Sequence, residues 1–160
     1  MTGAAVTHAV LALGSNLGDR AGALTEAVRR IADLPGVDLV AASSARESIA
    51  LTPSGPDADA PAYLNSVVAV ETALTPEALL GAVNAIETDL GRVRGERWAD
   101  RTLDIDIIVF GDLVVETERL TVPHPRAAER DFVLEPWLEI EPDAVIPGLG
   151  SVRELAEALR

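Results

Sequence analysis

The sequence predicts an α+β fold: a ferredoxin-like βαββαβ core, whose mostly antiparallel sheet carries helices on one face, followed by a C-terminal extension. Four β-type runs alternate with two runs of helical periodicity in the order β-α-β-β-α-β. A stretch rich in Pro, Gly and Asp, residues 51–62, predicts a loop between the second and third strands. The 160 residues contain no internal repeat or linker, so we expect one domain over residues 1–160.

The first half of the chain predicts a strand, a helix and a second strand. Residues 8–14 are β-rich and end in the polar turn GSNLGDR, where Asp19 is a candidate helix N-cap. Pro35 and Gly36 stop the helix, and residues 37–48 predict the second strand. The buried stripe of this helix consists of Leu24, Val28, Ile31 and Leu34.

The second half repeats the pattern in the order strand, helix, strand. Residues 63–74 predict the third strand, and Thr75, followed by proline, is a candidate cap of the second helix. Gly91 ends that helix, and residues 102–110 predict the fourth strand. A capping box that begins at Ser151 predicts a last short helix. The buried stripe of the second helix consists of Leu79, Leu80, Val83, Ile86 and Leu90.

Composition excludes several classes of function. The formal charge of −13 disfavours nucleic-acid binding, and the chain has no cysteine for a thiolate nucleophile or thiolate metal site. All of its basic residues are arginine, so no lysine is available for a Schiff base or a P-loop. We find no apolar run of membrane-spanning length and no secretory signal pattern. We therefore expect a cytoplasmic enzyme that acts on small molecules as a monomer, rather than a membrane protein.

Two acidic residues interrupt the apolar fourth strand. Asp104 and Asp106 share one face, about 6–7 Å apart at Cα from the strand rise, whereas the odd-numbered residues of the strand form an apolar opposite face. Two such carboxylates can converge on Mg²⁺, which takes one or two protein carboxylates together with phosphate oxygens and water. The alternative is a strand end whose two acids face water. The opposite face consists of Leu103, Ile105, Ile107 and Val109.

An arginine-rich loop precedes this strand. Residues 92–101 contain four arginines against two acidic residues, with Trp98 among them. Arginine can bind two phosphate oxygens at once, and the tryptophan could stack on a flat ring. Alternatively, these arginines pair with neighbouring carboxylates. Their position beside the acid pair favours a Mg²⁺–nucleotide site. The arginines are Arg92, Arg94, Arg97 and Arg101.

Further polar and aromatic residues could complete such a site. Residues 118–134 hold His124 in a rigid PHP sequence, where it could donate to a phosphate oxygen or transfer a proton. Tyr63 and Phe132 could sandwich a planar ligand while Asn65 reads its donors and acceptors. The alternative for both aromatic residues is an ordinary place in the core. The other polar candidates in this segment are Arg119, Thr121, Arg126 and Arg130.

Several motifs together resemble the 6-hydroxymethyl-7,8-dihydropterin pyrophosphokinases of folate biosynthesis. They are LALGSNLGDR, YLNSVVAVET, GRVRGERW, RTLDIDII followed by FGD, and LTVPHP followed by RDFVLEPWLEI. They occur in order from about residue 9 to residue 147. The resemblance implies transfer of a pyrophosphoryl group from ATP to the hydroxymethyl oxygen of the reduced pterin, with release of AMP.

The resemblance also implies roles for individual residues. Asp104 and Asp106 would hold two Mg²⁺ ions, and Arg92 and Arg94 would belong to a mobile catalytic loop. The residues implied at the nucleotide are Glu87, Arg97, Arg101, Arg119, Thr121, His124 and Arg130. The residues implied at the pterin are Thr52, Pro53, Tyr63, Asn65, Trp98 and Phe132. Residues 52–61 differ in length and detail from the usual pterin loop of the family.

Two other functions fit part of the pattern. A nucleotidyl transferase or cyclase on the same fold would also use paired acids and arginines, but it would not require the set formed by Tyr63, Asn65 and Phe132. A ferredoxin-like RNA-binding module should present aromatic platforms in a basic field. This chain has five aromatic residues and a strongly negative charge, which disfavours the RNA-binding alternative.

Overall fold

The structure is a computed structural model of the chain. It describes residues 6–15, 20–48, 50–52, 55–57, 63–91 and 103–159. Within these ranges no helix is long and apolar enough to cross a membrane.

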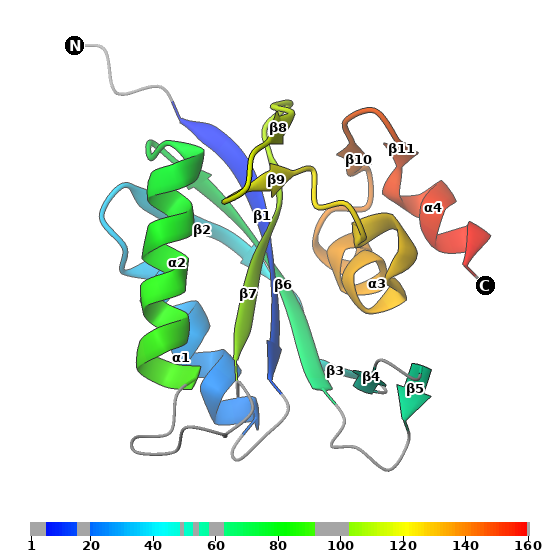
Figure 1. The fold of residues 1–160 in the computed structure, drawn as a ribbon, viewed down its shortest axis with the longest axis horizontal. Coiled ribbons are helices and arrows are strands. Elements are labelled where there is room, and N and C mark those ends of the chain that lie inside the picture. The colour runs from blue at the N-terminus through cyan, green and yellow to red at the C-terminus, as the bar shows by residue number, and fades with distance from the viewer. Residues whose placement is uncertain are drawn as a thin grey trace.

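An antiparallel sheet forms the centre of the molecule (Figure 1). Its main path runs in the order β2-β6-β1-β7, and β3 pairs with the first part of β6. Because β1 and β2 are both antiparallel to β6, they run parallel to each other with β6 between them, as a split βαβ unit requires. The ferredoxin-like core predicted from the sequence is confirmed. The strands are β1 (Thr7–Ser15), β2 (Val37–Ala42), β3 (Arg46–Ser48), β6 (Tyr63–Thr72) and β7 (Asp104–Phe110).

Helices α1 (Arg20–Ala32) and α2 (Pro76–Gly91) cover one face of this sheet. Their apolar stripes pack on alternate residues of the central strands, which explains why helical and strand periodicity could both be read from the sequence. The predicted cap of α2 is present, since the Ala78 N–H donates to the Thr75 hydroxyl at 3.1 Å.

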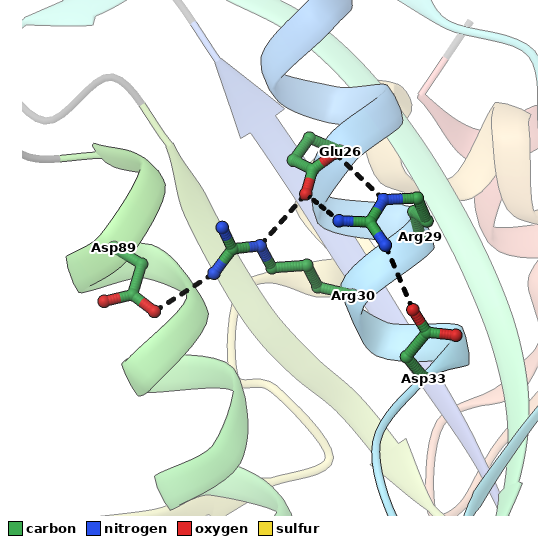
Figure 2. A network of polar contacts seen from close by, with 5 residues as sticks. All are labelled: Glu26, Arg29, Arg30, Asp33 and Asp89. Atoms are coloured by element: carbon green, nitrogen blue, oxygen red, sulfur yellow. Dashed lines mark hydrogen bonds and ion pairs between the residues drawn. The ribbon is translucent and has the colours of Figure 1, made fainter.

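A surface network of ion pairs joins the two helices (Figure 2). Arg30 of α1 donates to Glu26 one turn earlier and to Asp89 of α2, both at 3.1 Å. Arg29 also binds Glu26, and it donates to Asp33 at 3.1 Å. These hydrogen bonds, first from Arg29 and then from Arg30, lower the pKa of Glu26 to about 2. The network is exposed, so it orients the helices more than it stabilises them.

The opposite face of the sheet is also covered, which the sequence analysis did not predict. Helix α3 (Asp131–Ile140) lies across it, with α4 (Val152–Ala158) beside α3. Trp137 of α3 is 1% exposed and belongs to a second core with Val10 of β1 and other residues of this face. The sequence did contain a signal for this second covered face: β1 and β6 have consecutive apolar residues, which require burial on both faces of the sheet.

Polar contacts fix the end of α3 to the sheet. His8 Nε2 of β1 lies 2.6 Å from Glu141 Oε2, and His8 Nδ1 lies 3.2 Å from Glu71 Oε1 of β6. Trp137 Nε1 donates to the other oxygen of Glu141 at 2.8 Å. The predicted Ser151 cap of α4 is present, since Ser151 Oγ accepts from the backbone N–H of the third residue of that helix at 3.2 Å.

Short strands correct two of the predicted boundaries. The second predicted strand, residues 37–48, is interrupted at residues 43–45 and therefore forms both β2 and β3. Part of the predicted loop 51–62 forms a two-stranded ladder of β4 and β5. The remaining short elements are β4 (Ala50–Thr52), β5 (Gly55–Asp57), β8 (Val115–Glu116), β9 (Thr121–Val122), η1 (Ala127–Glu129), β10 (Val145–Ile146) and β11 (Gly150–Ser151).

A register shift changes the predicted faces of β7. The pairing of β1 with β7 slips between Val10 and Leu11, opposite Ile108. An extra residue in one strand reverses the alternation beyond it. Val109 was predicted to lie with the residues facing α1 and α2, but it belongs to the core under α3, and Phe110 takes the opposite place. The alternation around Asp104 and Asp106 precedes this shift and is unaffected.

Candidate active site

A cavity of about 180 Å³ lies at one end of the sheet, between the strands and α3. It collects residues that are far apart in the sequence, from the end of β1, from β3, from the starts of β6 and β7, and from the first turn of α3. Its lining consists of Ala12, Leu13, Gly14, Ser48, Tyr63, Asn65, Asp104, Asp106, Arg130, Phe132 and Val133.

The strand register explains why these residues meet. Gly14 of β1 stands opposite Asn65 of β6 on one side and opposite Asp104 of β7 on the other. Directly opposite residues point to the same face of a sheet, so these three positions form a row across it. Ala12 stands in the same way opposite Asp106, and Ala12 belongs to the core under α3. Both aspartates therefore lie on the α3 face, at the cavity.

The acid pair gives the cavity one charged wall. Asp104 and Asp106 are both partly exposed, and the side chain of Asp106 is 46% exposed. Two carboxylate groups on one open face fit the donor set of Mg²⁺, which fills its remaining positions with phosphate oxygens and water. Within the described ranges, no three His, Asp or Glu side chains are grouped so that they could hold a metal by themselves.

His124 lies beside the acid pair. Its Nε2 is 4.0 Å from Asp106 Oδ2, and its backbone N–H donates to the Ile108 carbonyl at 2.8 Å. The Arg126 N–H donates to Nδ1 at 3.2 Å, so the neutral ring carries its proton on Nε2, facing the carboxylate. Burial lowers the pKa of His124; Asp106 opposes this effect, and Arg130 and Arg126 add to it. The ring is thus a neutral N–H donor near pH 7.

The opposite wall is aromatic and amide-bearing. Tyr63 and Phe132 both line the cavity, and the Arg130 guanidinium lies 5.7 Å from the centre of the Phe132 ring, within range of a cation–π contact. Asn65 is 5% exposed and donates from Nδ2 to Ser48 Oγ at 2.7 Å. A flat ligand between the aromatic rings would thus meet a carboxamide at its edge.

Other predicted nucleotide residues lie outside this lining. Glu87 of α2 accepts a hydrogen bond from the Ile105 N–H at 2.8 Å and so occupies the outer edge of β7. Thr121 lies in β9, and Arg119 is exposed just before it. The nucleotide roles of these three residues remain predictions.

Several predicted residues lie outside the described part of the chain. Thr52 ends β4, where the structure describes its backbone only. The predicted site residues outside the described ranges are Pro53, Arg92, Arg94, Arg97, Trp98 and Arg101, and the predicted helix cap Asp19 also lies outside them.

Five members of the cavity wall were not predicted from the sequence: Ala12, Leu13, Gly14, Ser48 and Val133. Gly14 was taken as the end of a strand, yet a Cβ there would lie 3.2 Å from Asn65 Oδ1 and 3.3 Å from Tyr63 Cδ1. Ser48 was placed in one long strand, which hid its separate pairing in β3 opposite Tyr63. The one signal in the sequence was Gly14 itself, because a glycine in a strand often marks a place where another group approaches closely.

Comparisons with known proteins identify similar chains. A family model described as 7,8-dihydro-6-hydroxymethylpterin-pyrophosphokinase matches residues 10–142. Two relatives bear the name 2-amino-4-hydroxy-6-hydroxymethyldihydropteridine pyrophosphokinase. The one from Methylorubrum extorquens is 46% identical over 149 residues, which cover 93% of this chain and 91% of the relative. The one from Haemophilus influenzae is 42% identical with the same coverage of both chains.

A solved structure supports the fold. The wild-type HPPK-DHPS of Plasmodium falciparum with pteroate aligns with a TM-score of 0.73 at 15% identity. The alignment covers 99% of this chain and 43% of that one. At this identity the likeness concerns the fold.

Proposed function

The chain belongs to the 6-hydroxymethyl-7,8-dihydropterin pyrophosphokinase family, and on that basis we propose how its cavity performs the family reaction. The reaction transfers pyrophosphate from ATP to the hydroxymethyl group of the pterin and belongs to folate biosynthesis. The observation that carries the proposal is that the acid pair and the set formed by Tyr63, Asn65 and Phe132 line one cavity.

The aromatic end of the cavity binds the pterin in this proposal. Tyr63 and Phe132 stack on the two faces of the bicyclic ring, and Asn65 hydrogen-bonds to its edge. The support is their common place in the cavity. Thr52, Pro53 and Trp98 complete the pterin site by resemblance.

The acidic end binds the phosphates. Asp104 and Asp106 would hold two Mg²⁺ ions, which would offset the negative charge of the triphosphate when bound. His124 donates from Nε2 to a phosphate oxygen, consistent with its lowered pKa and the proton position set by Arg126. Arg130, at the boundary between the two ends, offers a guanidinium to the transferred group.

The remaining predicted residues act on the nucleotide. Arg92 and Arg94 stabilise charge on the leaving group, which is the role of a cationic loop in phosphoryl-type transfer. The residues proposed to contact the nucleotide and its phosphates are Glu87, Arg97, Arg101, Arg119 and Thr121.

The proposed reaction forms one bond and breaks one bond at the β-phosphorus of ATP. The hydroxymethyl oxygen forms a bond to the β-phosphorus of ATP, and the bond from that phosphorus to the α–β bridging oxygen breaks. The electron pair of the broken bond remains with AMP, and the hydroxyl proton passes to water. In this proposal the two carboxylates and His124, whose Nε2 lies 4.0 Å from Asp106 Oδ2, stand beside the reacting phosphate rather than beside the pterin.

The test is direct. The purified chain is incubated with Mg-ATP and 6-hydroxymethyl-7,8-dihydropterin, and the nucleotide products are separated. We expect AMP together with the pterin diphosphate. Release of inorganic pyrophosphate without pterin diphosphate would instead indicate a cyclase or nucleotidyl transferase. Retention of RNA on a filter at moderate salt would support the RNA-binding alternative, and with a formal charge of −13 we expect none.

We also propose that the protein acts in the cytoplasm as a monomer and that residues 1–160 form a single pyrophosphokinase domain. The support for a monomer is that one chain provides both the acidic and the aromatic end of the cavity. Light scattering of the purified protein tests this point.

A further inference from the structure

We propose that Ser48 is a positioning residue that fixes the Asn65 carboxamide with its oxygen facing the ligand. The pair would then select a ring edge that presents an N–H donor. This inference deepens the proposed function, because it rests on a pterin occupying the cavity.

The first observation is the hydrogen bonding of the amide nitrogen. Asn65 Nδ2 donates to Ser48 Oγ at 2.7 Å and to the Arg46 carbonyl at 3.3 Å, while the Tyr63 carbonyl lies further away at 3.5 Å. A primary amide has two N–H groups, so both are used within the protein. The nitrogen has no proton left for a ligand.

The second observation fixes the direction of the oxygen. Turning the amide over would place Oδ1 against the Arg46 carbonyl, acceptor against acceptor, which is unfavourable in a buried site. Oδ1 therefore lies on the Gly14 side, where a Cβ would approach it to 3.2 Å. Gly14 lines the same cavity, so the oxygen is an acceptor at the cavity wall.

The third observation is that α3 holds the strand that carries Ser48. The Ser44 N–H and hydroxyl both donate to the Glu139 carboxylate at 2.7 Å, and Arg46 donates to it at 3.1 Å. These bonds, first from Ser44 and then from Arg46, lower the pKa of Glu139. Helix α3 thus supplies Phe132 to the cavity and also anchors the approach to β3.

The chemistry that this pair recognises follows from the acceptor. A pterin carries an N–H and an exocyclic amino group on its pyrimidine edge, whereas the matching lumazine has a carbonyl in place of that amino group. Both rings carry an N–H at position 3, so the discrimination arises where the fixed acceptor faces position 2. There it accepts a hydrogen bond from the pterin amino group and repels the lumazine carbonyl. A freely turning amide could adapt to either ligand and would discriminate less.

The experiment compares Ser48→Ala with Ser48→Thr and with Ser66→Ala as the matched control. Ser66 is a buried serine on β6 whose hydroxyl has no hydrogen-bond partner among the described residues, so its loss should leave binding unchanged. Dissociation constants for 6-hydroxymethylpterin and for the matching lumazine are measured by calorimetry with a non-hydrolysable ATP analogue. The affinity for the ATP analogue alone and the melting temperature are recorded for every variant.

We expect Ser48→Ala to weaken pterin binding roughly tenfold, the scale of one lost hydrogen bond in a buried site, and to reduce the preference over lumazine by a similar factor. Affinity for the ATP analogue and turnover at saturating pterin should stay within about twofold. Ser48→Thr, which keeps the hydroxyl, should restore pterin binding. If Ser48→Ala does not fold, Ser48→Cys provides the same test with a side chain of similar shape and weak hydrogen bonding.

Wild-type pterin affinity in Ser48→Ala, equal weakening of both ligands, or failure of Ser48→Thr to restore binding would each overturn the positioning role. These results differ from failure of the proposed function. If the proposed function is wrong, neither the wild-type chain nor any Ser48 variant will produce AMP.

Discussion

Replacing Gly14 by alanine tests whether the cavity wall is shaped for a ligand. The glycine lies in β1 at a φ that any residue can adopt, so an added methyl group causes no backbone strain. The methyl carbon would lie 3.2 Å from Asn65 Oδ1 and 3.3 Å from Tyr63 Cδ1, against about 3.5–4.0 Å for an unstrained carbon contact. Both side chains must therefore move by a few tenths of an ångström.

Two opposing terms set the change in the free energy of unfolding. Crowding in a packed site destabilises by about 1–3 kcal/mol, and the partly exposed Tyr63 can give way, which favours the lower end. Alanine also restricts the unfolded chain, which stabilises the fold by about 0.4–1 kcal/mol. We therefore expect a net loss of stability below about 2 kcal/mol.

Ligand binding should respond more strongly. The methyl group displaces the proposed stacking ring and the proposed acceptor together, so we expect the KM for the pterin to rise at least about tenfold, equivalent to about 1.4 kcal/mol. The KM for ATP should change little. Steady-state kinetics with each substrate varied in turn, combined with urea unfolding, separates the two effects.

Gly81→Ala is the matched control. Gly81 lies inside α2, and among the described residues only its own helix and chain neighbours come within 4 Å of an added Cβ. Alanine should therefore stabilise the helix by up to about 1 kcal/mol and leave both KM values unchanged. An unchanged pterin KM in Gly14→Ala, or a stability loss well above 3 kcal/mol, would refute the reasoning.

Three further predictions follow from the same contacts. Asp104→Asn or Asp106→Asn should reduce AMP formation at least about a hundredfold with an unchanged circular dichroism spectrum; near-normal turnover at saturating Mg²⁺ would contradict the acid-pair role. Glu139→Gln should lower the melting temperature at pH 7, because a carboxyl group with a lowered pKa stabilises the fold while it is ionised. The difference from wild type should disappear as the pH falls from the ordinary glutamate pKa of 4.5 through the lowered pKa of Glu139. A difference in melting temperature that does not change with pH would contradict this role of Glu139. Trp137→Phe removes a 2.8 Å hydrogen bond to Glu141 and part of a fully buried ring, so urea unfolding should show a loss of about 1–3 kcal/mol; no measurable loss would contradict the anchoring of α3.

Most elements of the fold could be predicted from local sequence patterns. The α1 stripe and the Thr75 cap of α2 depend on neighbours within one helical turn. Both are found as predicted, except that Leu34 lies beyond the last residue of α1. The alternation that places Asp104 and Asp106 on one side of β7 is equally local. The strand interruption at residues 43–45 and the register shift at Ile108 were not predicted, because they arise from pairing with other strands.

By itself the sequence determined the order of the elements, the common face of the two aspartates and, through the resemblance, the family. Those features follow from backbone periodicity and from motifs that are contiguous along the chain. Only the tertiary structure decided that α3 covers the second face of the sheet, that Gly14 aligns Asn65 with Asp104, and that Ser48 holds the amide. These depend on strand register and on packing between distant segments, because a hydrogen bond such as that from Asn65 to Ser48 exists only once β3 and β6 have paired.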